Sequence, residues 1–211
     1  LENNIEFLNG KISKKDNILE IGSGCGDLLS YLQKQGYHAV GTDVSESGIA
    51  IAKRFFPAIK ITKMSGDRLQ FPNRSFDVVL SFDVLEHIPD TGKHLREVFR
   101  VLKRKGVYIF QTPNKITNRL AEFLWVTFTG KSRWPKELHC SLQTYPGLKR
   151  ALSQNGFDFR FYKINPVTKH TLTRVRGGLG TVGAFAFRMF PWELLPMHLQ
   201  TNFYVVARKK S

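Results

Sequence analysis

Three glycines at alternate positions, Gly22, Gly24 and Gly26, carry the clearest chemical signal in the 211-residue sequence. They follow a short apolar run, Ile18–Ile21, which indicates a buried parallel strand. Glycine lets the backbone approach a ligand closely, and a helix that begins at Asp27 would present free N–H groups at its start. The pattern therefore predicts a nucleotide-type site built from a strand, a glycine turn and a helix N-terminus.

The kind of nucleotide follows from what stands beside these glycines. A dinucleotide fingerprint would place its last glycine where the sequence has Asp27, and the Gly-Lys-Ser/Thr ending of a P-loop is absent. An aspartate there would repel a pyrophosphate, but it is compatible with a zwitterionic amino acid or a sulfonium. Asp43 ends the next apolar run, 21 positions after Gly22, where a carboxylate can hold both ribose hydroxyls of an adenosine.

The stretch Glu20-Ile-Gly-Ser-Gly-Cys-Gly, together with Asp43, resembles the cofactor site of class I S-adenosylmethionine (SAM) dependent methyltransferases of the type-11 kind. The resemblance covers about residues 16–164 and includes the family's Phe-Asp-x-Val strand, which begins here at Phe76. It implies SAM as cofactor, S-adenosylhomocysteine as product, and Asp67 at the adenine amino group. The residues expected at the cofactor are Glu20, Gly22, Ser23, Gly24, Gly26, Asp43, Val44, Asp67, Arg68 and Phe82.

His87, just beyond the expected fourth strand, is the best placed candidate for a catalytic base. Methyl transfer from a sulfonium is an in-line displacement that can depend on alignment alone, but a hydroxyl acceptor must also lose its proton. An imidazole, whose ordinary pKa is about 6.5, suits that task. A histidine that merely caps the turn or orients a loop is the alternative.

The stretch Asp83-Val-Leu-Glu86-His87 leaves a second interpretation open. It resembles the Glu-x-x-Glu-His stretch of quinone-biosynthesis O-methyltransferases and of small-RNA 2′-O-methyltransferases, with Asp83 in place of the first glutamate. Together with His139, these side chains could bind one divalent cation through oxygen and imidazole ligands. The shorter reach of Asp83 argues against this, and no metal is expected.

Alternating strands and helices must position these residues. Strands are expected at residues 18–21, 39–43, 59–62, 76–82, 107–112, 157–164 and 203–207. Lys103–Lys105 are expected in the last turn of the helix before the fifth strand, with Gly106 ending that helix. The pattern is typical of an open α/β sheet whose ligands bind at the carboxyl ends of the strands. By family analogy, the fold is a Rossmann-like, doubly wound, seven-stranded sheet of order 3-2-1-4-5-7-6 with an antiparallel last strand.

Residues 1–211 are predicted to form one domain, whose cofactor-binding half spans residues 16–113. Two insertions, at 114–143 and 165–200, are expected to cap the acceptor side. The first combines an apolar helical face with a basic, aromatic loop that contains Arg133 and Trp134. The second is longer than a hairpin needs, and its four glycines would make it a flexible loop.

The net charge of +15 lies mostly in the second half of the chain. Residues 1–110 carry 16 basic and 13 acidic side chains, whereas residues 111–211 carry 16 basic and only 4 acidic ones. This imbalance predicts peripheral contact with an anionic membrane surface or with RNA, although a solvated basic surface explains it equally well.

The sequence also predicts the compartment. No uninterrupted apolar run of about 18 residues occurs, so no transmembrane segment is expected. The two cysteines, Cys25 and Cys140, lie far apart without the spacing of a disulfide framework or a zinc motif. These features are typical of a reduced, cytoplasmic protein, here one that could sit peripherally at a membrane.

The resulting hypothesis is a SAM-dependent methyltransferase that acts on a small or lipid-like acceptor, at a hydroxyl oxygen. A basic cap rich in aromatic residues would suit an anionic amphiphile. Two alternatives stay open: an RNA methyltransferase whose basic C-terminal half stacks aromatic side chains on bases, and a non-catalytic SAM-binding partner protein. The intact glycine turn with Asp43 and Asp67 argues against the second alternative.

Overall fold

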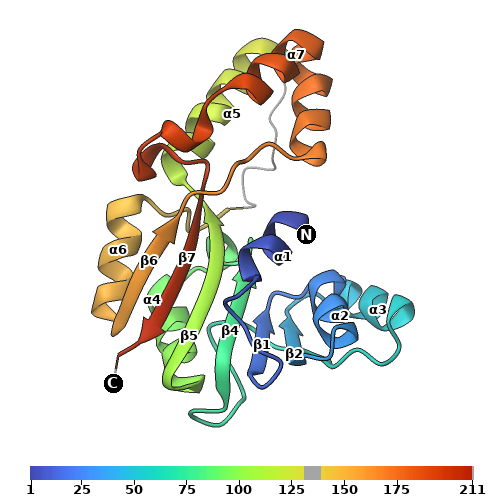
Figure 1. Ribbon diagram of the computed structural model, residues 1–211, viewed down its shortest axis with the longest axis vertical. Helices are drawn as coiled ribbons and strands as arrows, with labels where there is room; N and C mark the ends of the chain where they lie inside the picture. Colours follow the sequence, from blue (N-terminus) through green and yellow to red (C-terminus); the bar gives the residue numbers. More distant parts are fainter. Residues whose placement is uncertain (131–138, 211) are drawn as a thin grey trace.

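The computed structural model describes residues 1–130 and 139–210, which form one seven-stranded sheet of order β3-β2-β1-β4-β5-β7-β6 (Figure 1). The strands are β1 (Asn17–Ile21), β2 (His38–Asp43), β3 (Ile61–Lys63), β4 (Phe76–Phe82), β5 (Leu102–Pro113), β6 (Phe157–Tyr162) and β7 (Asn202–Lys209). β7 runs antiparallel to β5 and β6, and the strands from β3 to β5 are mutually parallel. The expected order and the antiparallel last strand are confirmed. β3 begins two residues late, because the amide of Ile59 donates to the carbonyl of Phe56 in a turn.

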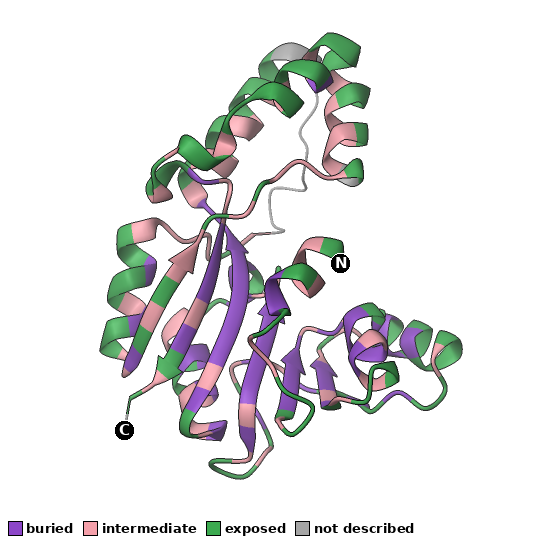
Figure 2. Cartoon of the chain, in the orientation of Figure 1, coloured by how far each residue is buried: buried purple, intermediate pink, exposed green. Residues whose placement is uncertain are grey.

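Helices cover both faces of the sheet. They are α1 (Glu2–Leu8), α2 (Asp27–Lys34), α3 (Glu46–Phe55), α4 (Thr91–Val101), α5 (Lys115–Thr129), α6 (Tyr145–Gln154) and α7 (Lys169–Met189), with short 3-10 turns η1 (Leu85–His87), η2 (Trp192–Leu194) and η3 (Met197–Leu199). Successive strand residues point to opposite faces. Leu19 and Val79 therefore pack with α4 and α6, while Ile18 and Val78 pack with α1, α2 and α3. The central strands are buried between these two layers (Figure 2).

Side-chain caps fix where several helices begin. The Oγ of Ser45 accepts a hydrogen bond from the amide of Gly48 at 3.0 Å, which starts α3 directly after β2. Asp90 caps α4 through the amide of Lys93 at 2.8 Å. Because each helix starts at a defined residue, the turn that precedes it is held at the carboxyl edge of the sheet.

The predicted boundary between α4 and β5 is wrong. α4 ends at Val101, so Lys103–Lys105 belong to the strand and Gly106 does not end the helix. Leu102 already pairs with β4. The carbonyl of Leu102 instead accepts a hydrogen bond of 2.8 Å from Nζ of Lys209, in β7. Lys209, distant in sequence, thus provides the positive charge at the C-terminal end of α4 that was predicted for Lys103–Lys105.

Residues 165–200 are not the flexible loop that their glycines suggested. α7 occupies most of this segment and is kinked at Gly180, whose φ is 69° and ψ −171°. Gly178 lies so close to the ring of Trp125 in α5 that a Cβ there would collide with it. These two glycines therefore provide a kink and a close helix–helix contact instead of flexibility.

α5 and α7 lie together beyond the carboxyl ends of the parallel strands (Figure 1). The basic, aromatic loop predicted around Arg133 and Trp134 lies outside the described residues. That the two insertions cover an acceptor stays a prediction. No helix in the described part of the chain is long and apolar enough to cross a membrane.

Candidate functional site

The three alternate glycines form the turn between β1 and α2. Gly22, Gly24 and Gly26 have φ values of 74°, 51° and 84°, in the left-handed region that favours glycine. The amides of Gly22 and Ser23 donate to the carbonyl of Thr42 at 2.7 and 2.9 Å, which ties the turn to β2. A Cβ at Gly24 would meet no atom of the described residues within 4 Å. A ligand can therefore approach this backbone closely.

Asp43, at the end of β2, is held against this turn. Its Oδ2 accepts a hydrogen bond from the amide of Gly24 at 2.7 Å, and its Oδ1 accepts one from the amide of Ser45 at 2.8 Å. Each carboxylate oxygen keeps a further lone pair, and Asp43 is half-exposed. Two backbone donors thus fix the orientation of the predicted ribose ligand, while the neighbouring Val44 is exposed.

Glu20 lies in β1 just before the glycine turn and is only 5% exposed. Burial raises the pKa of its carboxyl group to about 7, against an opposing hydrogen bond from Ser23. Among the described residues, its Oε2 has no hydrogen-bond partner. A buried carboxyl oxygen without a partner can accept a hydrogen bond from a ligand group or from an ordered water. The amino group of SAM's methionine moiety is such a donor.

The other predicted cofactor residues lie at the same edge of the sheet. Asp67, after β3, accepts a hydrogen bond from the Oγ of Ser65 and pairs with Nζ of Lys93 at 3.3 Å. The Ser65 hydrogen bond is the main cause that lowers the pKa of Asp67. Arg68 is exposed, and Phe82 is half-buried at the end of β4. Contact of Asp67 with an adenine stays a prediction.

The glycine turn also touches the segment that carries His87. A Cβ at Gly22 would collide with the side chain of Val84, the residue that precedes η1. Just before it, Asp83 has a positive φ of 54°, and its amide donates to Oε1 of Gln111 at 2.9 Å. This sharp turn after β4 places η1 beside the glycine turn, so the candidate base lies close to the candidate cofactor site.

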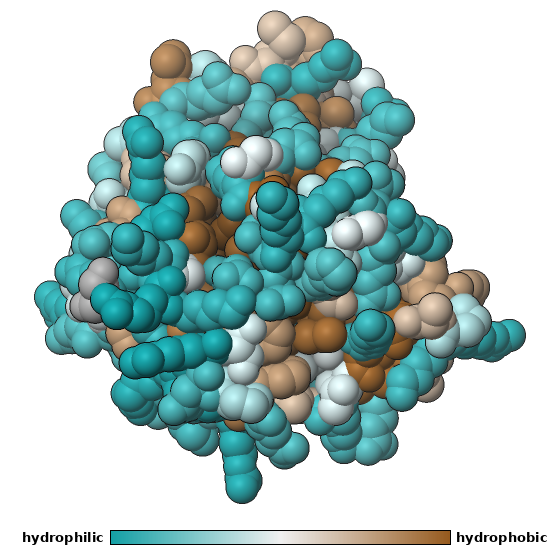
Figure 3. Space-filling view, turned by 60° about the horizontal axis from the view of Figure 1, so that its bottom comes forward, coloured by the Kyte–Doolittle hydropathy of each residue, from teal (hydrophilic) through white to brown (hydrophobic). Residues whose placement is uncertain are grey.

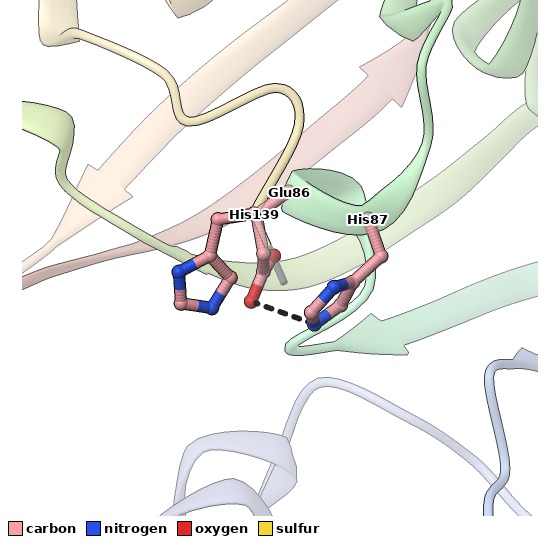
Figure 4. Close-up of side chains that lie close together, drawn as sticks. All are labelled: Glu86, His87 and His139. Atoms are coloured by element: carbon pink, nitrogen blue, oxygen red, sulfur yellow. Dashed lines mark ion pairs between the residues drawn. The ribbon is translucent and has the colours of Figure 1, made fainter. Parts of the chain in front are cut away.

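Glu86, His87 and His139 form one cluster, in which the carboxyl group of Glu86 lies between the two imidazole rings (Figure 4). Oε1 of Glu86 lies 3.9 Å from Nε2 of His87, and Oε2 accepts a hydrogen bond of 3.0 Å from Oγ1 of Thr112. Burial raises the pKa of Glu86 to about 7. Burial, together with the neighbouring His87, lowers the pKa of His139.

The chain after the undescribed segment is bound to η1. The amide of Ser141 donates to the carbonyl of Glu86 at 3.0 Å, and its Oγ donates to the carbonyl of Leu85 at 2.7 Å. The amide of Lys115 donates to the carbonyl of Gln143 at 2.8 Å. These bonds hold His139 near His87. The sequence did not single out Ser141, because a lone serine in a loop carries no local signal.

The cluster allows two kinds of chemistry. Its ligand atoms lie within 4.8 Å of one another, a spacing that one divalent cation could bridge. A buried carboxyl group beside imidazoles can also accept and pass on a proton. Asp83 is exposed and stands outside this group, so the four residues first considered as ligands are not assembled together.

A family model described as a methyltransferase domain matches residues 1–160. A probable S-adenosylmethionine-dependent methyltransferase of Mycolicibacterium smegmatis is 34% identical over 101 residues, which are 48% of this chain and 39% of that protein. A ubiquinone biosynthesis O-methyltransferase of Paramagnetospirillum magneticum is 33% identical over 46% of this chain and 41% of its own length. A ubiquinone/menaquinone biosynthesis C-methyltransferase of Rickettsia bellii is 30% identical over 56% of this chain and 52% of its own length. The chain thus spans about two-fifths to one-half of the length of these relatives.

Solved structures show the same fold. An S-adenosylmethionine-dependent methyltransferase from Mesorhizobium loti superimposes with a TM-score of 0.69 at 20% identity, covering 98% of each chain. Phosphoethanolamine N-methyltransferase 2 of Haemonchus contortus, solved in complex with S-adenosyl-L-methionine, gives a TM-score of 0.70 at 19% identity and covers all of this chain and 53% of that one. At such identities the likeness concerns the fold alone.

Proposed function

The chain belongs to the methyltransferase-domain family of class I, SAM-dependent enzymes, and on this basis we propose that it transfers a methyl group from SAM to a hydroxyl oxygen of a small or lipid-like acceptor. The observation that carries the acceptor side is the contact between Gly22 and Val84. It brings the cluster of Glu86, His87 and His139 beside the glycine turn.

The residues present fit SAM. The open face of Gly24 accommodates a closely approaching ligand, and Oε2 of Glu20, which has no partner among the described residues, can accept a hydrogen bond from an amino group. Asp43, oriented by two backbone amides, offers lone pairs to ribose hydroxyls. When bound, SAM supplies a methyl group on a positively charged sulfur, which is already activated for in-line displacement.

On the acceptor side, the cluster can take the proton that a hydroxyl group must lose. His87 is 40% exposed in its side chain, so it can reach an acceptor, whereas Glu86 is almost fully buried. The raised pKa of Glu86, about 7, allows its carboxyl group to hold a proton near neutral pH. Thr112 fixes the other oxygen of Glu86. We assign His87 as the base and Glu86 as the residue that orients it.

The acceptor class rests on two supports. The relative from Paramagnetospirillum magneticum is named as a ubiquinone biosynthesis O-methyltransferase, a name that favours a small, lipid-like acceptor here. In addition, large apolar side chains of α5 and α7 are exposed beyond the strand ends, where an apolar acceptor tail could be accommodated. An oxygen acceptor is favoured over carbon because the cluster is suited to removing a hydroxyl proton.

The test is methyl transfer from methyl-labelled SAM to a phenol that carries an alkyl tail, with the O-methylated form of the same phenol as control. We expect label in the organic phase for the free phenol only, and an Asp43→Ala variant should react more slowly when the SAM concentration is limiting. A lipid extract used in place of the phenol tests further lipid-like molecules as acceptors.

Label that instead appears in ribonuclease-sensitive material would favour the RNA methyltransferase. SAM binding without transfer to phenols, lipid extract or RNA would favour the non-catalytic binding protein.

A further inference from the structure

The pair of helices α5 and α7 lies outside the two hydrophobic cores of the sheet (Figures 1 and 2). Among the side chains described in these helices, only Ala184 is buried. The pair is joined by the close contact of Trp125 with Gly178. Most of its surface is therefore left to solvent.

The second half of α7 carries an outward-facing apolar stripe. Val182, Phe185, Ala186 and Met189 stand at i, i+3, i+4 and i+7, on one face of the helix. The exposed fraction is 83% for Val182, 66% for Phe185 and 65% for Met189. Leu194, just beyond the helix, is 81% exposed. A surface helix normally turns such a stripe toward the core, so an outward stripe indicates an interaction surface.

α5 also carries an apolar stripe that is exposed to solvent. Ile116, Leu120, Phe123 and Leu124 stand at i, i+4, i+7 and i+8 and are all exposed, Phe123 by 66% and Leu120 by 55%. The apolar face that the sequence predicted for this helix is therefore turned to solvent. Figure 3 shows hydrophobic side chains at the upper end of the molecule, among hydrophilic ones.

Basic side chains predominate in the segment that contains α7. Residues 159–192 carry six basic side chains and no acidic one. Four of the six, Lys169, Arg174, Arg176 and Arg188, belong to α7 itself. A partner that covers this surface must tolerate apolar contact and carry negative charge. An anionic lipid bilayer has both properties at one boundary.

We call the exposed apolar side chains of the two helices the helix-pair surface; they are Ile116, Leu120, Phe123, Val182, Phe185 and Met189. We propose that the helix-pair surface docks on an anionic lipid bilayer, with its apolar side chains at the boundary between headgroups and acyl chains and the arginines of α7 at the headgroups. Because no helix of the described residues can span a bilayer, the pair would lie in the plane of the interface.

Two other occupants match the surface less well. RNA binds through aromatic rings that stack on bases, but four of the six residues are aliphatic or methionine and have no ring to stack. A second copy of the chain would bring two basic surfaces together, which like charge opposes. A bilayer meets both the apolar and the electrostatic requirement.

The proposal is tested by co-sedimentation of the whole chain with vesicles of phosphatidylcholine, alone or with roughly 30% phosphatidylglycerol, at low and moderate salt. We expect binding to the anionic vesicles, weakened by salt, and little binding to the neutral ones. Phe185→Glu should weaken binding to anionic vesicles at least tenfold. Phe55→Glu is the matched control, because Phe55 is 69% exposed on α3, away from the helix-pair surface.

Two charge-reversal variants give an independent measurement of the electrostatic contribution. Arg176→Glu should weaken vesicle binding severalfold, whereas Arg54→Glu on α3 should have a smaller effect. Calorimetric SAM binding by each variant reports that the fold is intact, and vesicle binding is read without any methyl transfer. The proposal is overturned if Phe185→Glu binds like Phe55→Glu, if RNA shifts in a gel while vesicles do not pellet the protein, or if the chain forms a stable dimer that Phe185→Glu dissociates.

Discussion

The carboxylate of Asp43 accepts a hydrogen bond of 2.7 Å from the amide of Gly24, and so joins the end of β2 to the middle of the glycine turn. Gly24 itself is open on the side where a Cβ would stand. One residue therefore both shapes the cofactor loop and offers its remaining lone pairs to a ligand. This double role decides how substitutions at position 43 should behave.

Asp43→Ala should lower SAM affinity about tenfold or more, the loss of a charge-assisted hydrogen bond worth roughly 1.5–3 kcal/mol. Asp43→Asn keeps one acceptor oxygen for the amide of Gly24 but loses the charge, so its affinity should be intermediate. Isothermal titration with SAM and with S-adenosylhomocysteine measures both. Affinity unchanged in Asp43→Ala would remove this residue from the cofactor site.

NAD should not compete for this site. Asp27 replaces the last glycine of a dinucleotide fingerprint and stands in the first turn of α2, where a pyrophosphate would need to approach. The measurement is displacement of labelled SAM by NAD, with S-adenosylhomocysteine as positive control. Displacement by micromolar NAD would contradict the choice of cofactor.

The sequence was sufficient to predict most strands and helices because their signals are local, whereas the sheet order was expected from the resemblance to the methyltransferase family. Apolar runs, the three glycines and caps such as Ser45 each lie within a few residues of the element they define. α7 could not be predicted in this way. Its glycines disfavour a helix, and the contact that explains Gly178 comes from Trp125, in another helix of the chain.

In the candidate site, too, some features could be predicted from the sequence, and others depend on contacts that only the fold shows. The position of Glu86 and His87 after β4 follows from sequence order, but their partners come from elsewhere. Thr112 lies in β5, and Ser141 fixes the loop that holds His139. Hydroxyl side chains are common, and only the folded arrangement shows which one reaches a buried carboxyl group.

Glu20→Gln should stabilise the ligand-free protein at high pH. Since burial raises the folded-state pKa of Glu20 to about 7, the folded protein keeps a proton that the unfolded chain loses above about pH 4.5. The contribution of the protonated Glu20 carboxyl group to the free energy of unfolding is therefore lost as pH rises from about 4.5 to 7. The shift corresponds to roughly 3 kcal/mol at most, at 1.36 kcal/mol per pKa unit.

Thermal unfolding at pH 5 and pH 8 measures this effect. The gain in Tm of Glu20→Gln over the wild type should be several degrees at pH 8 and small at pH 5. If Glu20 also receives the amino group of SAM, the same variant should bind SAM more weakly at pH 8. An equal Tm difference at the two pH values would show that Glu20 does not titrate in this window.

His87→Ala should lower turnover by about 10²-fold, with SAM affinity little changed, because the imidazole acts on the acceptor and not on the cofactor. The matched control is His38→Ala, an exposed histidine at the start of β2, which should leave turnover unaltered. Thr112→Val should reduce turnover less than His87→Ala, since it removes only the hydrogen bond that fixes Glu86.

The same assay separates the base from a metal ligand, through the response of the wild type to a chelator. If His87 is a base, a chelator leaves turnover unchanged, and only substitution of His87 lowers it. If the cluster holds a divalent cation, the chelator abolishes turnover and added Mg²⁺ or Mn²⁺ restores it, whereas added metal does not rescue His87→Ala. Full turnover in His87→Ala, with or without chelator, would leave alignment of the two substrates as the source of catalysis.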